Sequence, residues 1–312
     1  KMAHQNQYIN LSGLLTTKDY KNLHLVAHNV ALDKITPEMK GLNLTGTVNG
    51  SLSLTQKGKL YYPSADLFIR YFKLNGYDYG DLEASIYGNN DLSSFDVDAH
   101  FVNGRSLGFA TRGKVLLDKN KGTLLDLNAR FRDFALSPLN PFLEGIFYNL
   151  RGTVTGDVKI QGNVSDPQMN GELKLNKAGI GVTYLKLNSD IADGATIKVT
   201  NRTFDLDNWL LTDTAYKTQA NLSGTIRHNK LRDWFLDLKV KTLGKRFMVL
   251  NTPYTDDALF YGTAFIKGNA SIKGALDEIA IKVNAKTEEG TSFKIPLSDS
   301  ESVGDDSFIT FV

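Results

Sequence analysis

Five histidines are the residues of this chain whose chemistry could bind a metal. They are His4, His24, His28, His100 and His228. His24 and His28 lie four residues apart in the strand-like stretch LHLVAHNV, on one face of the strand. At the rise of an extended strand they are about 13 Å apart, which is too far to share a metal ion. We therefore interpret them as ordinary strand residues and expect no metal site.

Paired carboxylates could act as a general acid and base, and the stretch SFDVDAHF contains such a pair. Asp96, Asp98 and His100 alternate with apolar residues, so all three share the opposite face of a strand. Catalytic carboxylates need a closed pocket that shifts their pKa, and the surrounding sequence suggests none. We interpret this group as a solvated outer face.

Other motifs of enzymes are weak or absent. The glycines at 152–156 and 262–268 resemble a dinucleotide fingerprint only in being spaced glycines, because no crossover helix follows them. The chain has no Gly-x-Ser-x-Gly elbow, no zincin motif and no cysteine. We expect a protein that is not an enzyme and that uses no cofactor.

Charge and hydropathy exclude further classes. The 312 residues include 36 basic and 34 acidic ones, a formal charge of +2, which does not favour nucleic-acid binding. No run of 18 apolar residues and no signal segment is present. The first residues run directly into strand-like sequence and the last, SFITFV, stop on an apolar run, so we expect a segment of a longer chain.

Alternation of apolar and polar residues indicates the elements that would position any site. In the stretch Leu150 to Leu175, Val154, Val158 and Ile160 share one face, opposite Asp157 and Lys159. The same pattern recurs in short strands, separated by turns every 8 to 12 residues. We predict an all-β fold of about 20 strands, at about 4.8 Å spacing, with a few short amphipathic helices.

The clearest predicted helix is Ser137 to Leu150, with Ser137 as a possible cap. Its apolar side is predicted to consist of Leu139, Phe142, Ile146, Phe147 and Leu150. It could pack on the sheet as core, act as a plug over a groove, or bind a membrane surface. Glu144, with no lysine or arginine before Arg151, argues against the last.

Three Gly-rich strand starts indicate a degenerate repeat. Gly46, Gly152 and Gly262 are separated by 106 and 110 residues, and each follows a Pro-led segment. We predict one continuous elongated β-domain with strands of a preceding repeat at 1–36 and repeat units at 37–137, 138–252 and, incomplete, 253–312.

Such a sheet has one apolar face throughout, and the predicted helices are too few to cover it. Sheets beyond about 10 strands curl, split or close. Three folds would keep this apolar face from water: a β-sandwich, a closed barrel, or a curled trough that is open to an apolar ligand. The candidate groove residues are Leu52, Leu54, Ile69, Ile86, Phe95, Val97, Phe101, Val115, Leu117, Val154, Val158, Ile160, Leu173, Leu175, Leu185, Leu187, Ile197, Val199, Phe204, Leu206, Leu222, Leu236, Leu238, Val240, Ile266, Ile272, Ile279, Ile281 and Val283.

Two segments of the chain carry distinctive motifs. They are LRGTVTGDVKIQGNVSDPQMNGELKLNKAGIGVTYLKL (150–187) and LFYGTAFIKGNASIKGALDEIAIKVNAKTEEGTSFKIPL (259–297). The motifs are the Gly-x-x-x-Gly strand start, the turn and strand NVSDPQMNGE, and the ending AKTEEGTSFKIPL. In these motifs the segments resemble the TamB family of the AsmA-like, bridge-like lipid transfer superfamily. The resemblance extends from about residue 136 to 312, and the first third is similar only in style.

The resemblance implies a long curled, taco-like antiparallel sheet with an open hydrophobic trough. It implies a periplasmic protein, anchored in the inner membrane by a part absent from this chain, whose groove carries phospholipids between membranes. A TamA-like outer-membrane barrel would be its partner. Two alternatives remain: a scaffold that assists the assembly of outer-membrane β-barrel proteins, by strand addition at the sheet edge, and a transmembrane barrel, which the helical segments do not fit.

Overall fold

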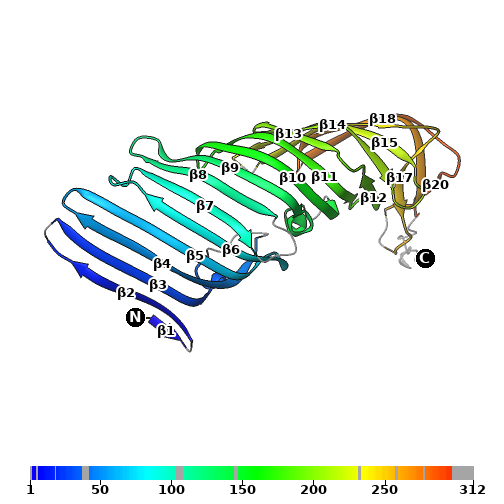
Figure 1. Cartoon of the computed structure of the whole chain (residues 1–312). Coiled ribbons are helices and arrows are strands. Elements are labelled where there is room, and N and C mark those ends of the chain that lie inside the picture. The colour runs from blue at the N-terminus through cyan, green and yellow to red at the C-terminus, as the bar shows by residue number, and fades with distance from the viewer. Residues whose placement is uncertain are drawn as a thin grey trace, which may run out of the picture.

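The computed structural model of the chain is a single long antiparallel β-sheet (Figure 1). It describes residues 2–4, 6–17, 19–36, 42–102, 108–143, 147–230, 233–256, 259–276 and 278–296. The predicted all-β class and the antiparallel sheet are confirmed, and a taco-like curl is consistent with the structure.

The sheet contains twenty strands among the described residues. They are β1 (Met2–His4), β2 (Gln7–Leu15), β3 (Tyr20–Ala31), β4 (Leu44–Lys57), β5 (Leu60–Leu74), β6 (Tyr77–Gly88), β7 (Ser94–Val102), β8 (Phe109–Asp118), β9 (Gly122–Ala135), β10 (Phe147–Asn163), β11 (Gln168–Val182), β12 (Leu187–Ile191), β13 (Thr196–Asn201), β14 (Thr203–Asp213), β15 (Gln219–Asn229), β16 (Asp233–Thr242), β17 (Phe247–Thr252), β18 (Tyr261–Ala275), β19 (Glu278–Thr287) and β20 (Ser292–Lys294). Two short 3₁₀ helices, η1 (Leu32–Lys34) and η2 (Ser137–Phe142), interrupt them.

Strands that follow one another along the chain are mostly neighbours in the sheet. From β1 to β11 each strand pairs with the next. β12 and β13 lie end to end between β11 and β14. β18 pairs with β16 and β17 on one side and with β19 and β20 on the other. The connections therefore alternate between two long rims of the sheet.

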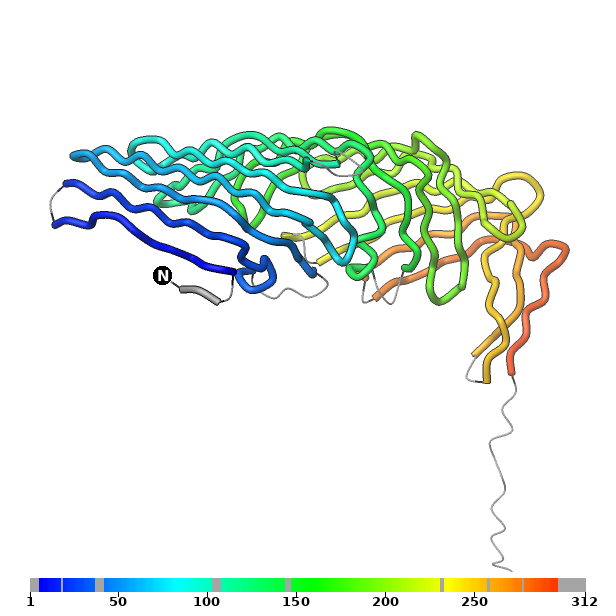
Figure 2. Tube along the Cα trace, turned by 60° about the horizontal axis from the view of Figure 1, so that its bottom comes forward, coloured from blue at the N-terminus to red at the C-terminus, as the bar shows by residue number. Residues whose placement is uncertain are grey.

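The sheet is curled into a trough, and β17, β20 and the start of β18, which pairs with both, hang from one end (Figure 2). We call the rim that carries the connections after β3, β5, β7, β9, β11 and β14 the lower rim. It carries the longer connections, at 32–43, 103–108 and 136–146, whereas those after β4 and β8 span only 58–59 and 119–121. All three Pro-led segments precede their strands on this rim.

Left-handed residues at β-bulges interrupt several strands near the lower rim. Asn29, Tyr71, Asp133 and Lys177, on β3, β5, β9 and β11, have φ of 52°, 52°, 48° and 48°. Each of these residues donates its backbone N–H to a side-chain oxygen of a neighbouring segment. The acceptors, in the same order, are Asn49 at 3.0 Å, Asp81 at 2.9 Å, Thr155 at 3.0 Å and Asp193 at 2.6 Å. Because a bulge bends its strand and increases its twist, this recurrent arrangement contributes to the curl.

The predicted helix Ser137 to Leu150 is wrong in its second half. Only η2 is helical; Phe147 and Leu150 belong to β10, and Ile146 lies outside the described residues. The side-chain amide of Asn140 explains the early end. It donates to the carbonyl oxygen of Leu150 and accepts from its N–H, both at 2.8 Å, as a neighbouring strand would.

The other Pro-led segments are not helical where they are described. Residues 37–41 lie outside the described residues, and Leu44 begins β4. Residues 253–256 and 259–260 form an irregular connection, and Tyr261 begins β18. Gly46, Gly152 and Gly262 lie near the starts of the long strands β4, β10 and β18, all with positive φ.

Candidate functional site

The apolar residues of successive strands face each other in register across the sheet. Leu52 of β4 lies opposite Leu25 of β3 and Ala65 of β5, and Ala65 lies opposite Ile86, which faces Val97 of β7. Directly opposed residues of an antiparallel pair share one face of the sheet. These side chains therefore form one continuous row.

The row continues over the rest of the molecule. Leu127 of β9 faces Ile160 of β10, and Ile197 lies between Leu173 and Leu206. Further on, Leu238 faces Ile272, and Ile272 faces Ile281. The candidate groove residues on the strands share this face; Leu185 does not, because it lies in the β11–β12 turn.

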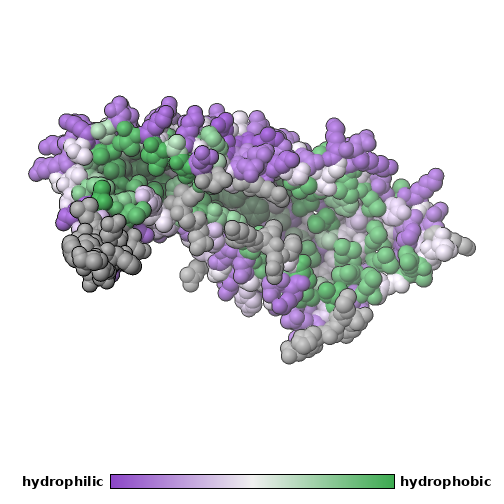
Figure 3. All heavy atoms as spheres, turned by 180° about the vertical axis from the view of Figure 1, so that it is seen from behind, coloured by the Kyte–Doolittle hydropathy of each residue, from purple (hydrophilic) through white to green (hydrophobic). Residues whose placement is uncertain are grey.

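This face is hollowed, and we call it the concave face. Figure 3 shows apolar side chains gathered in a hollow along the molecule, bordered by hydrophilic ones. The opposite, convex face carries the alternating polar residues. The predicted apolar trough thus has a physical counterpart in the structure.

Access to the concave face varies along its length. Towards the ends, Leu11, Leu52, Ile281 and Val283 are 62%, 48%, 58% and 60% exposed. Between them, one large cluster of buried residues extends over β10 to β16; it comprises Val154, Leu175, Ala178, Ile191, Leu206, Trp209, Leu211, Leu236 and Leu238. The concave face is therefore open at its two ends and packed as protein core between them.

Strand β17 crosses over the lower rim beside this buried cluster. Asn251 donates its N–H to the carbonyl oxygen of Leu185 at 3.1 Å, and Met248 donates its N–H to Oγ1 of Thr218 at 2.8 Å. The rings of Tyr184 and Phe260 meet edge to face at 5.1 Å. These contacts join segments far apart in the sequence, and Phe247 and Met248 are almost fully buried beneath them.

A cluster of aromatic rings, which the sequence analysis missed apart from Phe101, also fills part of the concave face. Tyr79 stacks on Phe101 and Phe134, with ring centroids 5.1 and 4.9 Å apart, and Phe109 lies between Phe101 and Phe131. Burial raises the pKa of the Tyr79 hydroxyl, and the neighbouring Tyr77 adds to the effect. The hydroxyl donates to the carbonyl oxygen of Ala135 at 3.1 Å.

Comparison with known protein families gives one match. Residues 207–312 match the model of the TamB C-terminal domain. Over these residues the chain is similar to the TamB C-terminal domain, and we call this range the TamB domain. The predicted TamB resemblance is thereby confirmed, over a shorter range than the 136–312 expected. Comparisons with curated proteins and with solved structures give no match.

The match over residues 207–312 supports a TamB-type role in the cell envelope, and TamB is not a family of enzymes. The TamB domain begins within β14 and includes β15 to β20, with the exposed apolar residues of β19. Across the described ranges, no helix is long and apolar enough to span a membrane.

One histidine of the TamB domain lies on the concave face. His228 is 4% exposed, and its ring lies 5.9 Å from that of Phe204 and 5.2 Å from that of Trp234. Burial lowers the pKa of His228, and the nearby Arg202 lowers it further, while Asp166 acts in the opposite direction. His228 is therefore held neutral inside an apolar wall.

The other histidines are not brought together. His24 contacts the hydroxyl of Ser53 at 2.8 Å, and His28 stacks on Tyr8 with ring centroids 5.1 Å apart. His100 lies 3.6 Å from Glu83 and 3.5 Å from Asp98 on the convex face. In the part of the chain that the structure describes, no three metal-ligating side chains cluster.

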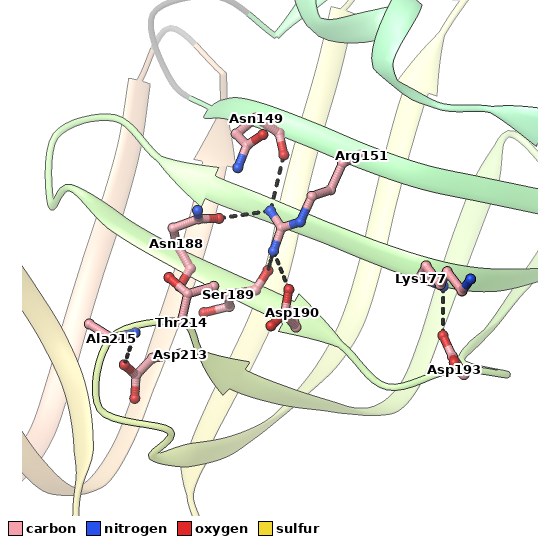
Figure 4. A network of polar contacts seen from close by, with 10 residues as sticks. All are labelled: Asn149, Arg151, Lys177, Asn188, Ser189, Asp190, Asp193, Asp213, Thr214 and Ala215. Atoms are coloured by element: carbon pink, nitrogen blue, oxygen red, sulfur yellow. Dashed lines mark hydrogen bonds and ion pairs between the residues drawn. The ribbon is translucent and has the colours of Figure 1, made fainter.

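A polar network near the lower rim connects β10 and β12, two strands that precede the TamB domain in the chain (Figure 4). Arg151 of β10 reaches across β11 to β12, where it donates to Oδ1 of Asn188 at 2.8 Å and to the carbonyl of Ser189 at 3.1 Å, and pairs with Asp190. Gly179 of β11 leaves the necessary room, because a Cβ there would lie 2.2 Å from the guanidinium carbon. The network stabilises the fold, and its polar groups form their hydrogen bonds and ion pair with one another.

Proposed function

We propose that the concave face shields the acyl chains of phospholipids while they pass between two membranes, in the periplasm and without covalent chemistry. The observation that carries this proposal is the continuous apolar row, which is in register from β3 to β19. The TamB match over residues 207–312 supports a cell-envelope setting for it.

The energetics of apolar burial favour such a ligand. Each CH₂ group kept from water contributes about 0.8 kcal/mol, so ten of them contribute about 8 kcal/mol. A row of side chains that crosses the strands at about 4.8 Å intervals offers similar contacts at each step. Along the exposed parts of the row, an acyl chain can therefore move without large differences in free energy, which suits transfer rather than tight storage.

A single charged side chain in the open part of the row tests this proposal. Leu52→Arg places a charge on the concave face, and Ser51→Arg places the same charge on the convex face of the same strand. We expect the amount of co-purified phospholipid, measured by mass spectrometry, to fall in the first variant and to match the unchanged chain in the second. Equal lipid content in both variants would contradict the proposal.

A second candidate function is a scaffold for outer-membrane β-barrel proteins, acting with a TamA-like barrel partner. The observation that favours it is the edge of β19, which among the described residues pairs only with β18. An unpaired edge offers backbone donors and acceptors to an added strand. Unfolded polypeptide in place of lipid in the purified material would favour this function over lipid transfer.

A further inference from the structure

Several basic residues on the convex face form ion pairs with acidic ones on the next strand. Lys114 pairs with Asp96 at 3.1 Å, and Lys159 pairs with Asp126 at 3.5 Å. Arg130 likewise donates to Asp157 at 2.7 Å. Cross-strand pairs of this kind neutralise the face locally and leave no strong binding potential.

Lys239 and Lys241 of β16 depart from this pattern. Lys239 lies between Ser223 and Ser271, and Lys241 lies between Asn221 and Asn269. Within the described ranges neither lysine forms an ion pair. The nearest acidic residue along the strand, Asp237, is already paired with Lys273 at 3.2 Å.

These six side chains line one depression in the convex face, with a volume of about 470 Å³. No carboxylate lines it. Lys282 of β19 adds a further ammonium group at its border, opposite Ser271. The depression thus presents ammonium, amide and hydroxyl donors together, while their negative counterparts are absent from its wall.

This donor set fits an oxyanion better than an apolar or cationic ligand. Lysine binds phosphate as a point charge, and serine and asparagine add neutral hydrogen-bond donors. Because both lysines are exposed, the attraction is screened within about 8 Å at physiological ionic strength, and binding should weaken with salt.

We propose that this depression is an oxyanion site that takes phosphate groups, separate from the apolar groove on the opposite face. The phosphate is carried by an anionic lipid headgroup or is free in solution. The proposal does not depend on acyl-chain transfer, since the lysine, serine and asparagine side chains that carry it all lie on the convex face.

The test uses the full chain with two double variants of equal charge change. The first, Lys239→Ser with Lys241→Asn, replaces each lysine by the residue type of its cross-strand neighbours. The control, Lys114→Asn with Lys159→Ser, removes two lysines that form ion pairs. Sedimentation with phosphatidylglycerol–phosphatidylcholine vesicles, at low and high salt, measures binding. We expect a salt-sensitive affinity that falls about 10-fold or more in the first double variant and changes less than about 2-fold in the control.

Inorganic phosphate distinguishes the two sources. If inorganic phosphate displaces the chain from the vesicles, the site binds single phosphate groups. If the chain binds the vesicles and phosphate does not displace it, the ligand is the phosphate of the lipid headgroups. Equal losses in the two double variants, or no binding to either vesicles or phosphate, would overturn the proposal. The groove variant Leu52→Arg should bind the vesicles normally, so failure of this site and failure of the groove give different results.

Discussion

At the scale of single residues, two polar side chains buried on the concave face favour their neutral forms. Tyr79 is 1% exposed, and its hydroxyl is satisfied by a backbone carbonyl. His228 is 4% exposed, between two aromatic rings. Burial disfavours the charged form of both side chains, so it raises the pKa of the tyrosine and lowers that of the histidine.

Alkaline pH should expose the contribution of Tyr79. Its folded pKa lies above the ordinary value of about 10, so its contribution is complete below pH 10 and is lost as the pH rises through the folded pKa. Tyr79→Phe should lower the free energy of unfolding by about 1 kcal/mol at neutral pH, through the lost hydrogen bond. The difference from the unchanged chain should shrink above pH 10 in denaturant titrations. Tyr20→Phe, at a more exposed position, is the control and should lose stability above pH 10 as the unchanged chain does.

Acidic pH should do the same for His228. Its folded pKa lies below the ordinary value of about 6.5, so the unfolded chain takes up the proton first and stability is lost as the pH falls below 6.5. His228→Phe should flatten the fall in melting temperature between about pH 6.5 and 5. The exposed variant His24→Phe should keep the fall; a flattened curve in that variant as well would contradict this assignment.

At the scale of the elements, the bulges determine how the strands bend. Lys177 occupies a left-handed conformation on β11 that costs about 1 kcal/mol for a residue other than glycine. We expect Lys177→Gly to leave stability unchanged or to raise it by up to about 1 kcal/mol, since the substitution removes this cost. Lys174→Gly on the same strand should lower stability by a similar amount. Lys174 has extended backbone, so glycine relieves no strain there and only adds conformational entropy to the unfolded chain. Calorimetric melting of both variants is the measurement, and equal destabilisation would show that the bulge is not strained.

The strands and the face they bury could be predicted from alternation, because the side-chain period of two is visible in Val154, Val158 and Ile160. The end of the helix at Phe142 could not be predicted, because it depends on the contact of Asn140 with Leu150. The bulge at Lys177 could not be predicted either, since lysine has no preference for left-handed backbone. The aromatic cluster was missed because Phe131 and Phe134 meet on one face only across the bulge at Asp133.

At the scale of the whole molecule, the sequence predicts an apolar face but not how much of it is accessible. The predicted trough is open at its ends, while the packing of β10 to β16 and the crossing of β17 bury its interior. Leu185, expected on the groove wall, instead provides a carbonyl for β17. Accessibility depends on contacts between segments that are distant in sequence, which local patterns do not contain.

Phospholipid contact should therefore follow the exposed ends of the concave face. Ile281→Arg in β19 should reduce bound lipid, because the charge enters the apolar row at a 58% exposed position. Ala280→Arg, the next residue and also exposed, faces the convex side and should have no effect. Lipid mass spectrometry on the two purified variants is the measurement. Loss of lipid in both would point to damage of the edge strand rather than of the groove.

The most direct test of the central claim is a photo-crosslinking scan along β19. A photoreactive side chain is placed in turn at Glu278, Ala280, Ile281 and Val283, four positions that are all exposed. If the concave face carries acyl chains, phospholipid adducts should form at 281 and 283 and not at 278 and 280. Adducts of equal yield at all four positions, or adducts with polypeptide in place of lipid, would contradict it.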